Sequence, residues 1–328
     1  MVTTDMLSGI LQCFGLPAQI KKATQLQYKK IQEGERALRD IIGVEVQSGE
    51  RYVVKLVDEP SHPRELIERQ IAFSEALRQS GALVARYYAC EDGWTIEKAV
   101  ENFHAIISCE DFIGTPIKKM NLQTIQTIGA LIGCQHRLSL EKTCRVGKQK
   151  TYLEVMSHSR YSKIWRGGLP KSVDESVYRS IERLHDTLMP TVEDIWLKLP
   201  MAAVHADVYA LNNIAMTAQG IAAYDFNLAA DEVLLGDLLI SWFRTVINPD
   251  MWNDIDDGNH HAYWQAMLKG YEQERRLTDP EKEHLPMLYT LMDAIYSSTL
   301  AFQFEEIEEY DNARICMRHA LSVLEEYR

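Results

Sequence analysis

The sequence predicts an α+β protein of two lobes: a small lobe built on an antiparallel sheet with one helix, and a larger, mostly helical lobe. Three observations support this. A chain of 328 residues is longer than one hydrophobic core usually covers. Strand-like patterns occur mainly within about the first hundred residues, and helical patterns dominate thereafter. The composition, 46% hydrophobic and 25% charged, is typical of a folded globular protein.

The small lobe is predicted from alternating apolar residues. They alternate with polar residues around 26–28, 44–46 and 52–56, which indicates strands of an antiparallel sheet. A helical pattern follows and ends at Gly81. Its single stripe consists of Leu66, Gln70, Phe73 and Leu77. A further strand is expected at 105–108.

The larger lobe is predicted from helical periodicity. Asn121 is a suitable N-cap for a helix that carries isoleucines at helical intervals, and another helix is expected over about 174–197. A short β-like insert at 202–226 separates these helices from those that run from about 259 to the end. We therefore expect lobes over 1–108 and 109–328, with a hinge at about 108–114.

Composition narrows the classes of partner and location. Acidic residues outnumber basic ones by 47 to 35, and the net charge of −12 argues against nucleic-acid or anionic-membrane binding. The six cysteines show neither CxxC pairs nor zinc-ligand spacing. The first residues lack the features of a secretory signal, and the longest apolar run, 233–243, is too short to cross a bilayer. We expect a cytoplasmic protein, and the sequence predicts no oligomeric state.

One stretch carries the residue types that phosphoryl transfer needs. His205 and Asp207 follow an apolar strand, Asn212 comes five residues after the aspartate, and Asp225-Phe226 follows a second apolar run. A carboxylate can orient and deprotonate an incoming hydroxyl, and Asn and Asp oxygens can hold Mg²⁺ against nucleotide phosphates.

The pattern HxDxxxxN followed by Asp-Phe resembles the aminoglycoside phosphotransferase and choline/homoserine kinase superfamily, whose members are related to protein kinases. The resemblance implies a protein-kinase-like fold, with ATP and Mg²⁺ as cofactors. It also implies that Asp207 is the catalytic base, that Asn212 and Asp225 bind Mg²⁺, and that His205 supports the loop. Ala206 stands where many members carry glycine. Asp237 is expected to support the metal loop from behind.

Lys55 is the residue that the resemblance assigns to the α- and β-phosphates. It lies in a predicted strand and shares a face with Val53 and Val57. Kinases pair this lysine with a helix glutamate, but the stripe facing the sheet carries Gln70, while Glu68 lies elsewhere on the helix. Both remain candidates for the partner of Lys55.

Two other segments are assigned from the resemblance by position. The segment 108–114, with Glu110, occupies the place of the hinge whose backbone would bind adenine. The loop at 32–36 would cover the phosphates, although it contains no GxGxxG. His136 resembles a family histidine that packs rather than reacts.

The leading hypothesis is an ATP- and Mg²⁺-dependent small-molecule kinase that phosphorylates a hydroxyl of an aminoglycoside, an amino alcohol or a similar polar molecule. The choice between ATP and GTP stays open, as does the acceptor. Acidic side chains of the larger lobe could line a cationic-substrate site, although such runs usually form a solvated helix face. They are Asp250, Asp254, Asp256, Asp257, Glu305, Glu306, Glu308 and Glu309. The alternative is a degenerate kinase-like protein that binds a nucleotide or a partner without turnover. A protein-serine/threonine kinase is disfavoured because no Ala-Pro-Glu follows Asp225.

Overall fold

The structure is a computed structural model that describes residues 2–31, 37–117, 120–148, 152–157, 172–209, 213–246 and 260–327. The chain divides into two compact units. The first comprises Met1–Ile117, Leu138–Lys148 and Asn213–Ala230, and the second comprises Lys118–Arg137, Gln149–Asn212 and Asp231–Arg328. The expected division near 108–114 remains a prediction.

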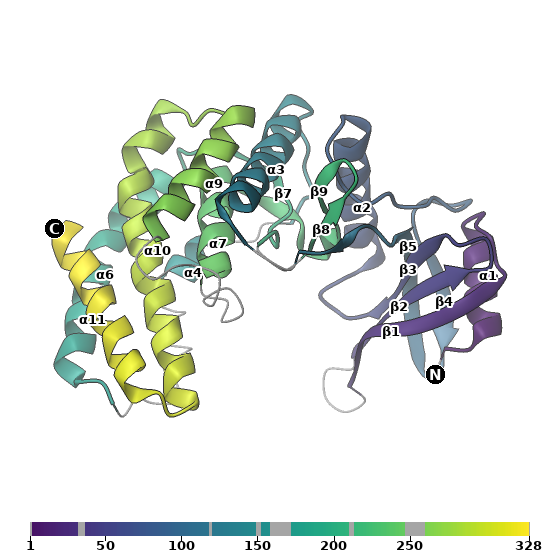
Figure 1. Cartoon of the computed structure of the whole chain (residues 1–328), viewed down its shortest axis with the longest axis horizontal. Helices are drawn as coiled ribbons and strands as arrows, with labels where there is room; N and C mark the ends of the chain where they lie inside the picture. The colour runs from purple at the N-terminus through teal and green to yellow at the C-terminus, as the bar shows by residue number, and fades with distance from the viewer. Residues whose placement is uncertain are drawn as a thin grey trace. The chain divides into compact units, whose positions relative to one another are not determined.

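The first unit is built on a five-stranded sheet in which every neighbouring pair is antiparallel, with the order β1-β2-β3-β5-β4 (Figure 1). Its strands are β1 Ile20–Ile31, β2 Ala37–Val46, β3 Arg51–Asp58, β4 Ile96–Val100 and β5 Phe103–Asp111. The small antiparallel sheet predicted from alternation is confirmed. Because β5 rather than β4 pairs with β3, residues far apart in sequence become neighbours on one sheet face.

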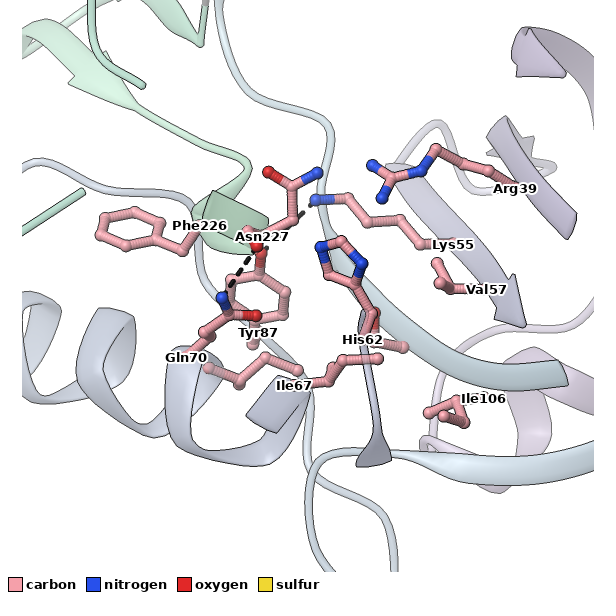
Figure 2. Close-up of a pocket in the computed structure, with 12 residues that line it drawn as sticks. Arg39, Lys55, Val57, His62, Ile67, Gln70, Tyr87, Ile106, Phe226 and Asn227 are labelled. Carbon is pink, nitrogen blue, oxygen red and sulfur yellow. Dashed lines mark hydrogen bonds between the residues drawn. The ribbon is translucent and has the colours of Figure 1, made fainter. Parts of the chain in front are cut away.

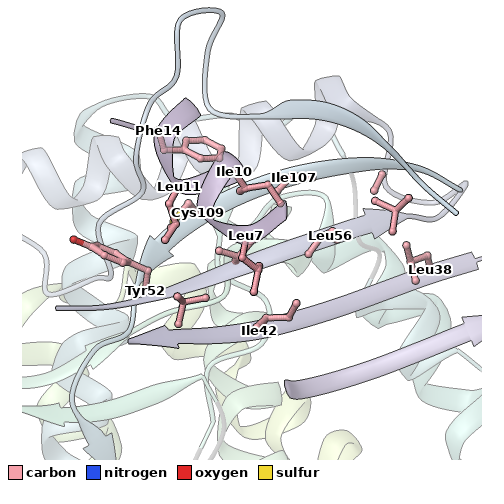
Figure 3. Close-up of a cluster of buried hydrophobic side chains, with 14 of the residues drawn as sticks. Leu7, Ile10, Leu11, Phe14, Leu38, Ile42, Tyr52, Leu56, Ile107 and Cys109 are labelled. Carbon is pink, nitrogen blue, oxygen red and sulfur yellow. The ribbon is translucent and has the colours of Figure 1, made fainter. Parts of the chain in front are cut away.

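An N-terminal helix, α1 (Thr4–Cys13), covers one face of this sheet (Figure 3). Thr3 is its N-cap and accepts a hydrogen bond from the Met6 amide. The apolar side of α1 packs on the alternate residues of the central strands, and the two sets form the core of the unit. This helix was not predicted from the sequence.

The opposite face of the sheet carries Lys55. The helix α2 (Arg64–Gln79), which the sequence predicted, belongs to this unit together with a three-stranded sheet of order β6-β8-β9. The strands of this second sheet are β6 Thr115–Pro116, β8 Ile214–Thr217 and β9 Gly220–Ala223. A short 3-10 turn, η2 (Phe226–Leu228), follows β9 and packs against α2.

The second unit is mostly helical, as expected, and it includes a two-stranded sheet of β7 and β10. Asn121 caps α3, because its Oδ1 accepts from the Thr124 amide at 2.9 Å. The described helices are α3 Leu122–Glu141, α4 Tyr152–Met156, α6 Glu175–Trp196, α7 Leu234–Val246, α9 His260–Glu274, α10 Asp279–Glu306 and α11 Tyr310–Tyr327. The strands are β7 Met201–Val204 and β10 Ala230–Val233. The last residues of α3 belong to the first unit.

Helix α7 is buried along nearly its whole length and forms the centre of this unit. Helices α3 and α9 cross at glycines. A Cβ on Gly129 would lie 2.0 Å from the Met267 carbonyl oxygen, and one on Gly270 would lie 1.8 Å from the Gln126 carbonyl oxygen. The two backbones therefore approach more closely than any side chain would allow. Within the described helices, none is both long and apolar enough to cross a membrane.

Candidate active site

Lys55 lies in the middle of β3 and makes two short ion pairs within the first unit. Its Nζ is 2.8 Å from Glu110 Oε1 and 2.8 Å from Asp225 Oδ1. The Tyr87 hydroxyl lies 3.4 Å from the same nitrogen. The sequence thus placed the lysine on the correct strand, and the structure adds the strand β5 and the loop after β9 as sources of its partners.

Burial and charge act in opposite directions on this lysine. Burial alone would lower the pKa of Lys55, but the charges of Asp225 and Glu110 hold it well above its ordinary value. Burial raises the pKa of Glu110, and the second carboxylate at Asp225 raises it further. Two acidic groups share one cation in this cluster, so the cluster can attract a further positive charge.

The helix α2 does not supply the partner of Lys55. Gln70 points its amide nitrogen at the carbonyl oxygens of Asn227 and Ala229, at 2.8 and 3.0 Å. Its own Oε1 is buried without a hydrogen-bond partner in the described part of the chain. Glu68 accepts instead from the amide of Trp94. Neither sequence candidate is thus the ion-pair partner, and Glu110 together with Asp225 takes that place.

Asp225 lies at the end of β9 in a left-handed backbone conformation, with φ of 61° and ψ of 68°. Aspartate tolerates this conformation better than most residues. The next residue, Phe226, is buried and meets Phe73 of α2 edge to face, with ring centroids 5.8 Å apart. The Phe73 contact and the two hydrogen bonds from Gln70 fix the backbone of the loop that follows Asp225.

The donor chemistry here fits Mg²⁺. The Asp225 carboxylate is a hard oxygen donor, and its side chain is 28% exposed. Mg²⁺ in kinases takes one or two protein oxygens and completes its shell with phosphates and water. The second predicted ligand, Asn212, lies outside the described residues, as does the loop at 32–36. Within the described residues, no group of three or more His, Cys, Asp or Glu side chains could hold a metal.

A small cavity beside Lys55 is lined by side chains from β2, β3, β5, α2 and η2 (Figure 2). Arg39 and His62 contribute to its wall and were not singled out from the sequence. Both contact Glu59, with Arg39 Nη2 at 2.7 Å and His62 Nδ1 at 3.2 Å. Burial lowers the pKa of His62, and the neighbouring Arg39 lowers it further. No motif marked these residues, because Arg39 reaches the cavity through the pairing of β2 with β3 and His62 through the connection between β3 and α2.

The predicted base, Asp207, lies in the second unit, in the loop after β7. Its Oδ1 is 2.6 Å from an Nη of Arg244 on α7. The guanidinium also lies 5.6 Å from the ring centroid of Tyr209. Sequence reasoning missed Arg244, because nothing in the loop motif indicates which helix faces it.

A buried hydrogen-bond network lies in the same unit and includes Asp237, the residue predicted to support the site. Its carboxylate lies 3.1 Å from His136 Nε2 and accepts from the Tyr152 hydroxyl at 2.9 Å. His136 Nδ1 lies 3.0 Å from the Tyr271 hydroxyl, which accepts from Arg275 at 2.7 Å. Burial alone would raise the pKa of Asp237, but these donors and the nearby charge of His205 lower it. His136 is thus packed within the interior, as expected.

Comparisons with known proteins were made for the whole chain. No protein-family model matches the sequence. The homoserine kinase of Rhizobium meliloti (strain 1021) is 27% identical over 136 residues, which is 41% of this chain and 39% of that protein. The matched segment thus spans about two fifths of that relative's length.

Solved structures match nearly the whole chain. A microcompartment-associated aminopropanol kinase superposes with a TM-score of 0.67 at 16% identity and covers 99% of this chain and 97% of its own. The amicoumacin kinase hAmiN, in complex with AMP-PNP and Ca²⁺, gives 0.62 at 17% identity, with 94% and 91% covered. Choline kinase LicA from Streptococcus pneumoniae gives 0.53 at 15% identity, with 99% and 98% covered. The predicted protein-kinase-like fold of small-molecule phosphotransferases is confirmed.

Proposed function

We propose that this protein is an ATP- and Mg²⁺-dependent kinase that phosphorylates a hydroxyl group of a small polar molecule. The observation that carries the proposal is the pairing of Lys55 with Asp225 at 2.8 Å. A lysine on the third strand and an aspartate before a buried phenylalanine are the residues that kinases use for the phosphates and the metal. Here they lie in contact although they are 170 positions apart in the sequence.

Each residue then has a distinct role. Lys55 binds the α- and β-phosphates, and Asp225 with Asn212 would hold Mg²⁺, which neutralises charge on the phosphates when bound. Asp207 accepts the proton of the acceptor hydroxyl, and Arg244 keeps its carboxylate oriented. His205 and Asp237 belong to the buried support of the catalytic loop.

An aromatic cavity of about 320 Å³ in the second unit supports a small acceptor. It is lined by Trp242, Phe243, Tyr289 and Tyr296, with Asp293 and His319 as polar groups. Aromatic faces with a carboxylate nearby suit an amine-bearing molecule. The other acidic residues considered above support this site less, because Glu306, Glu308 and Glu309 are exposed and 250–257 lies outside the described residues.

The test is to incubate the pure protein with ATP, Mg²⁺ and a panel of aminoglycosides, amino alcohols, homoserine and sugars, and to measure ADP release. We expect turnover on at least one acceptor, and a fall of roughly two to four orders of magnitude in Asp207→Asn, because the general base is removed. Asp194→Asn, at an exposed ion pair on α6, is the matched control and should keep full activity. Absence of any Mg²⁺-nucleotide binding would refute the proposal.

A second candidate is a nucleotide-binding protein without turnover. The observation that favours it is the 2.6 Å ion pair of Asp207 with Arg244, which occupies the carboxylate that a base must offer to its substrate. This candidate predicts Mg²⁺-nucleotide binding of normal strength with no ADP release on any acceptor. The same assay therefore separates the two.

A further inference from the structure

The protein has a glutamate next to its phosphate-binding lysine, but that glutamate comes from the sheet rather than from the helix. Lys55 pairs across the sheet with Ser108 of β5, and Val53 pairs with Glu110. Residues paired directly or spaced by two lie on the same face of a sheet. Glu110 and Lys55 therefore project from the same face, where they meet at 2.8 Å.

Helix α2 does not provide this carboxylate, because its residue at this position, Gln70, hydrogen-bonds another segment. Gln70 Nε2 donates hydrogen bonds of 2.8 and 3.0 Å to two carbonyl oxygens of the loop that follows Asp225. A glutamate at this position would place a charged acceptor against two other acceptors. Gln70 of α2 therefore holds the loop, and Glu110 of β5 pairs with the lysine.

The two acidic partners of Lys55 differ in how firmly they are held. The Asp225 side chain is 28% exposed and lies on a loop, whereas the Glu110 side chain is 2% exposed on a strand with neighbours on both sides. A buried carboxylate that lost its cation would keep an uncompensated charge in the interior. Asp225 can turn to another cation at much lower cost.

We propose, on the basis of the function proposed above, that Glu110 is the positioning residue of Lys55 and takes the place of the helix glutamate found in kinases. In the free protein Lys55 is shared by Glu110 and Asp225. With a magnesium nucleotide bound, Asp225 would hold the metal and Glu110 would keep Lys55 directed at the phosphates. This role differs from that of a hinge residue that touches adenine.

The test measures the dissociation constants of ADP and AMP-PNP, with and without Mg²⁺, for the full chain and for Glu110→Gln. We expect about ten- to hundredfold weaker binding in Glu110→Gln, because a charge-assisted contact to Lys55 is lost. If the protein turns over an acceptor, KM for ATP should rise in Glu110→Gln and KM for the acceptor should not.

Asp40→Asn is the matched control, and its nucleotide affinity should not change. Asp40 is equally buried in the same sheet, but it neighbours Ile41, the partner of Lys55, and so lies on the opposite face.

A double-mutant cycle separates this role from direct contact with the nucleotide. If Glu110 acts through Lys55, then Glu110→Gln adds little to the loss of affinity already caused by Lys55→Met. Additive losses would mean that Glu110 contacts the nucleotide itself, and this would overturn the proposal. Unchanged nucleotide affinity in Glu110→Gln would also overturn it.

Folding is checked by the melting temperature of each variant without nucleotide. Should Glu110→Gln fail to fold, Glu110→Asp keeps the charge and withdraws it by one methylene, and the expected loss of affinity is smaller but still selective for the nucleotide. A wild-type protein that binds no nucleotide would refute the proposed function. Wild-type binding with an unaffected Glu110→Asp would refute only this inference.

Discussion

Ala206 immediately precedes Asp207 and has a φ of 66°, a conformation that glycine adopts freely and alanine does not. The cost of such a residue is about 1–3 kcal/mol, and it persists only where the surroundings enforce it. Ala206 is 2% exposed, so packing holds it. Alanine in place of the family's glycine therefore keeps the glycine-like backbone conformation at this position. It also restricts the loop backbone more than glycine would.

The value of the Gln70 amide can be tested by Gln70→Glu. The carboxylate would face the carbonyl oxygens of Asn227 and Ala229, so we expect a loss of roughly 1–3 kcal/mol in unfolding free energy. Chemical denaturation measures this. Gln79→Glu, exposed at the end of the same helix, should change stability by less than about 0.5 kcal/mol. Equal stability of Gln70→Glu and wild type would show that Gln70 does not anchor the loop.

At the residue scale, the sequence singled out side chains that belong to a motif. It did not reveal contacts that arise only from the pairing of distant strands. Asp207 and Asp225 stand in the motif that carries the family resemblance, and that resemblance singled out Lys55; their roles stay predictions. Glu110 lay within a predicted segment but was assigned to a hinge, because its contact with Lys55 requires that β5 lies beside β3. Strand order of this kind is set by packing between distant segments, which local patterns do not encode.

At the scale of elements, periodicity predicted most of the structure. The helix expected over 66–77 is α2, and the helix expected over 174–197 is α6. The missed helix α1 does carry a signal, since its apolar residues have the spacing of one helical face and follow the N-cap Thr3. These residues are Leu7, Ile10 and Leu11, and the C-cap Phe14 packs in the same core. A helix this short is marginal by itself and gains its stability from the sheet on which it packs.

The crossing of α3 and α9 can be tested through its glycines. In Gly270→Ala the new Cβ would overlap the Gln126 carbonyl oxygen, so the helices must move apart. We expect a destabilisation of about 1–3 kcal/mol by thermal or chemical unfolding.

Gly9→Ala is the control for this change. Gly9 lies in α1, and the nearest atom to its Cβ is the flexible end of Lys98 at 3.8 Å. Alanine there should raise stability by about 0.5–1 kcal/mol through helix propensity. If Gly270→Ala were as stable as Gly9→Ala, the close crossing would not exist in solution.

At the scale of the whole molecule, each unit contains some of the residues assigned to the proposed reaction. The first holds the lysine with its two carboxylates, and the second holds the Asp207–Arg244 pair and the buried network of Asp237. The second unit also contains Glu232, a buried glutamate of β10 that accepts from the amides of Tyr152 and Val233 at 2.6 and 2.8 Å. Burial raises the pKa of Glu232 to about 7 despite these donors.

This shift predicts how stability depends on pH. The folded protein keeps a proton on Glu232 that the unfolded chain releases above its ordinary pKa of 4.5. The contribution is therefore fully present below about pH 4.5 and is lost as pH rises through about 7, with a total on the order of 3 kcal/mol. His319, whose pKa is raised by its hydrogen bond to Asp293, also stabilises the fold less as the pH rises, but at higher pH than Glu232.

We expect the unfolding free energy, measured by urea denaturation, to fall between pH 5 and 7. The plot of unfolding free energy against pH should be flatter in Glu232→Gln, because glutamine does not titrate. Glutamine has one acceptor oxygen in place of two, so one of the two backbone amides loses its acceptor, but this loss is the same at every pH. His319→Gln should keep the slope between pH 5 and 6 and flatten it only above. Identical slopes for wild type and Glu232→Gln would mean that Glu232 is ionised throughout this range.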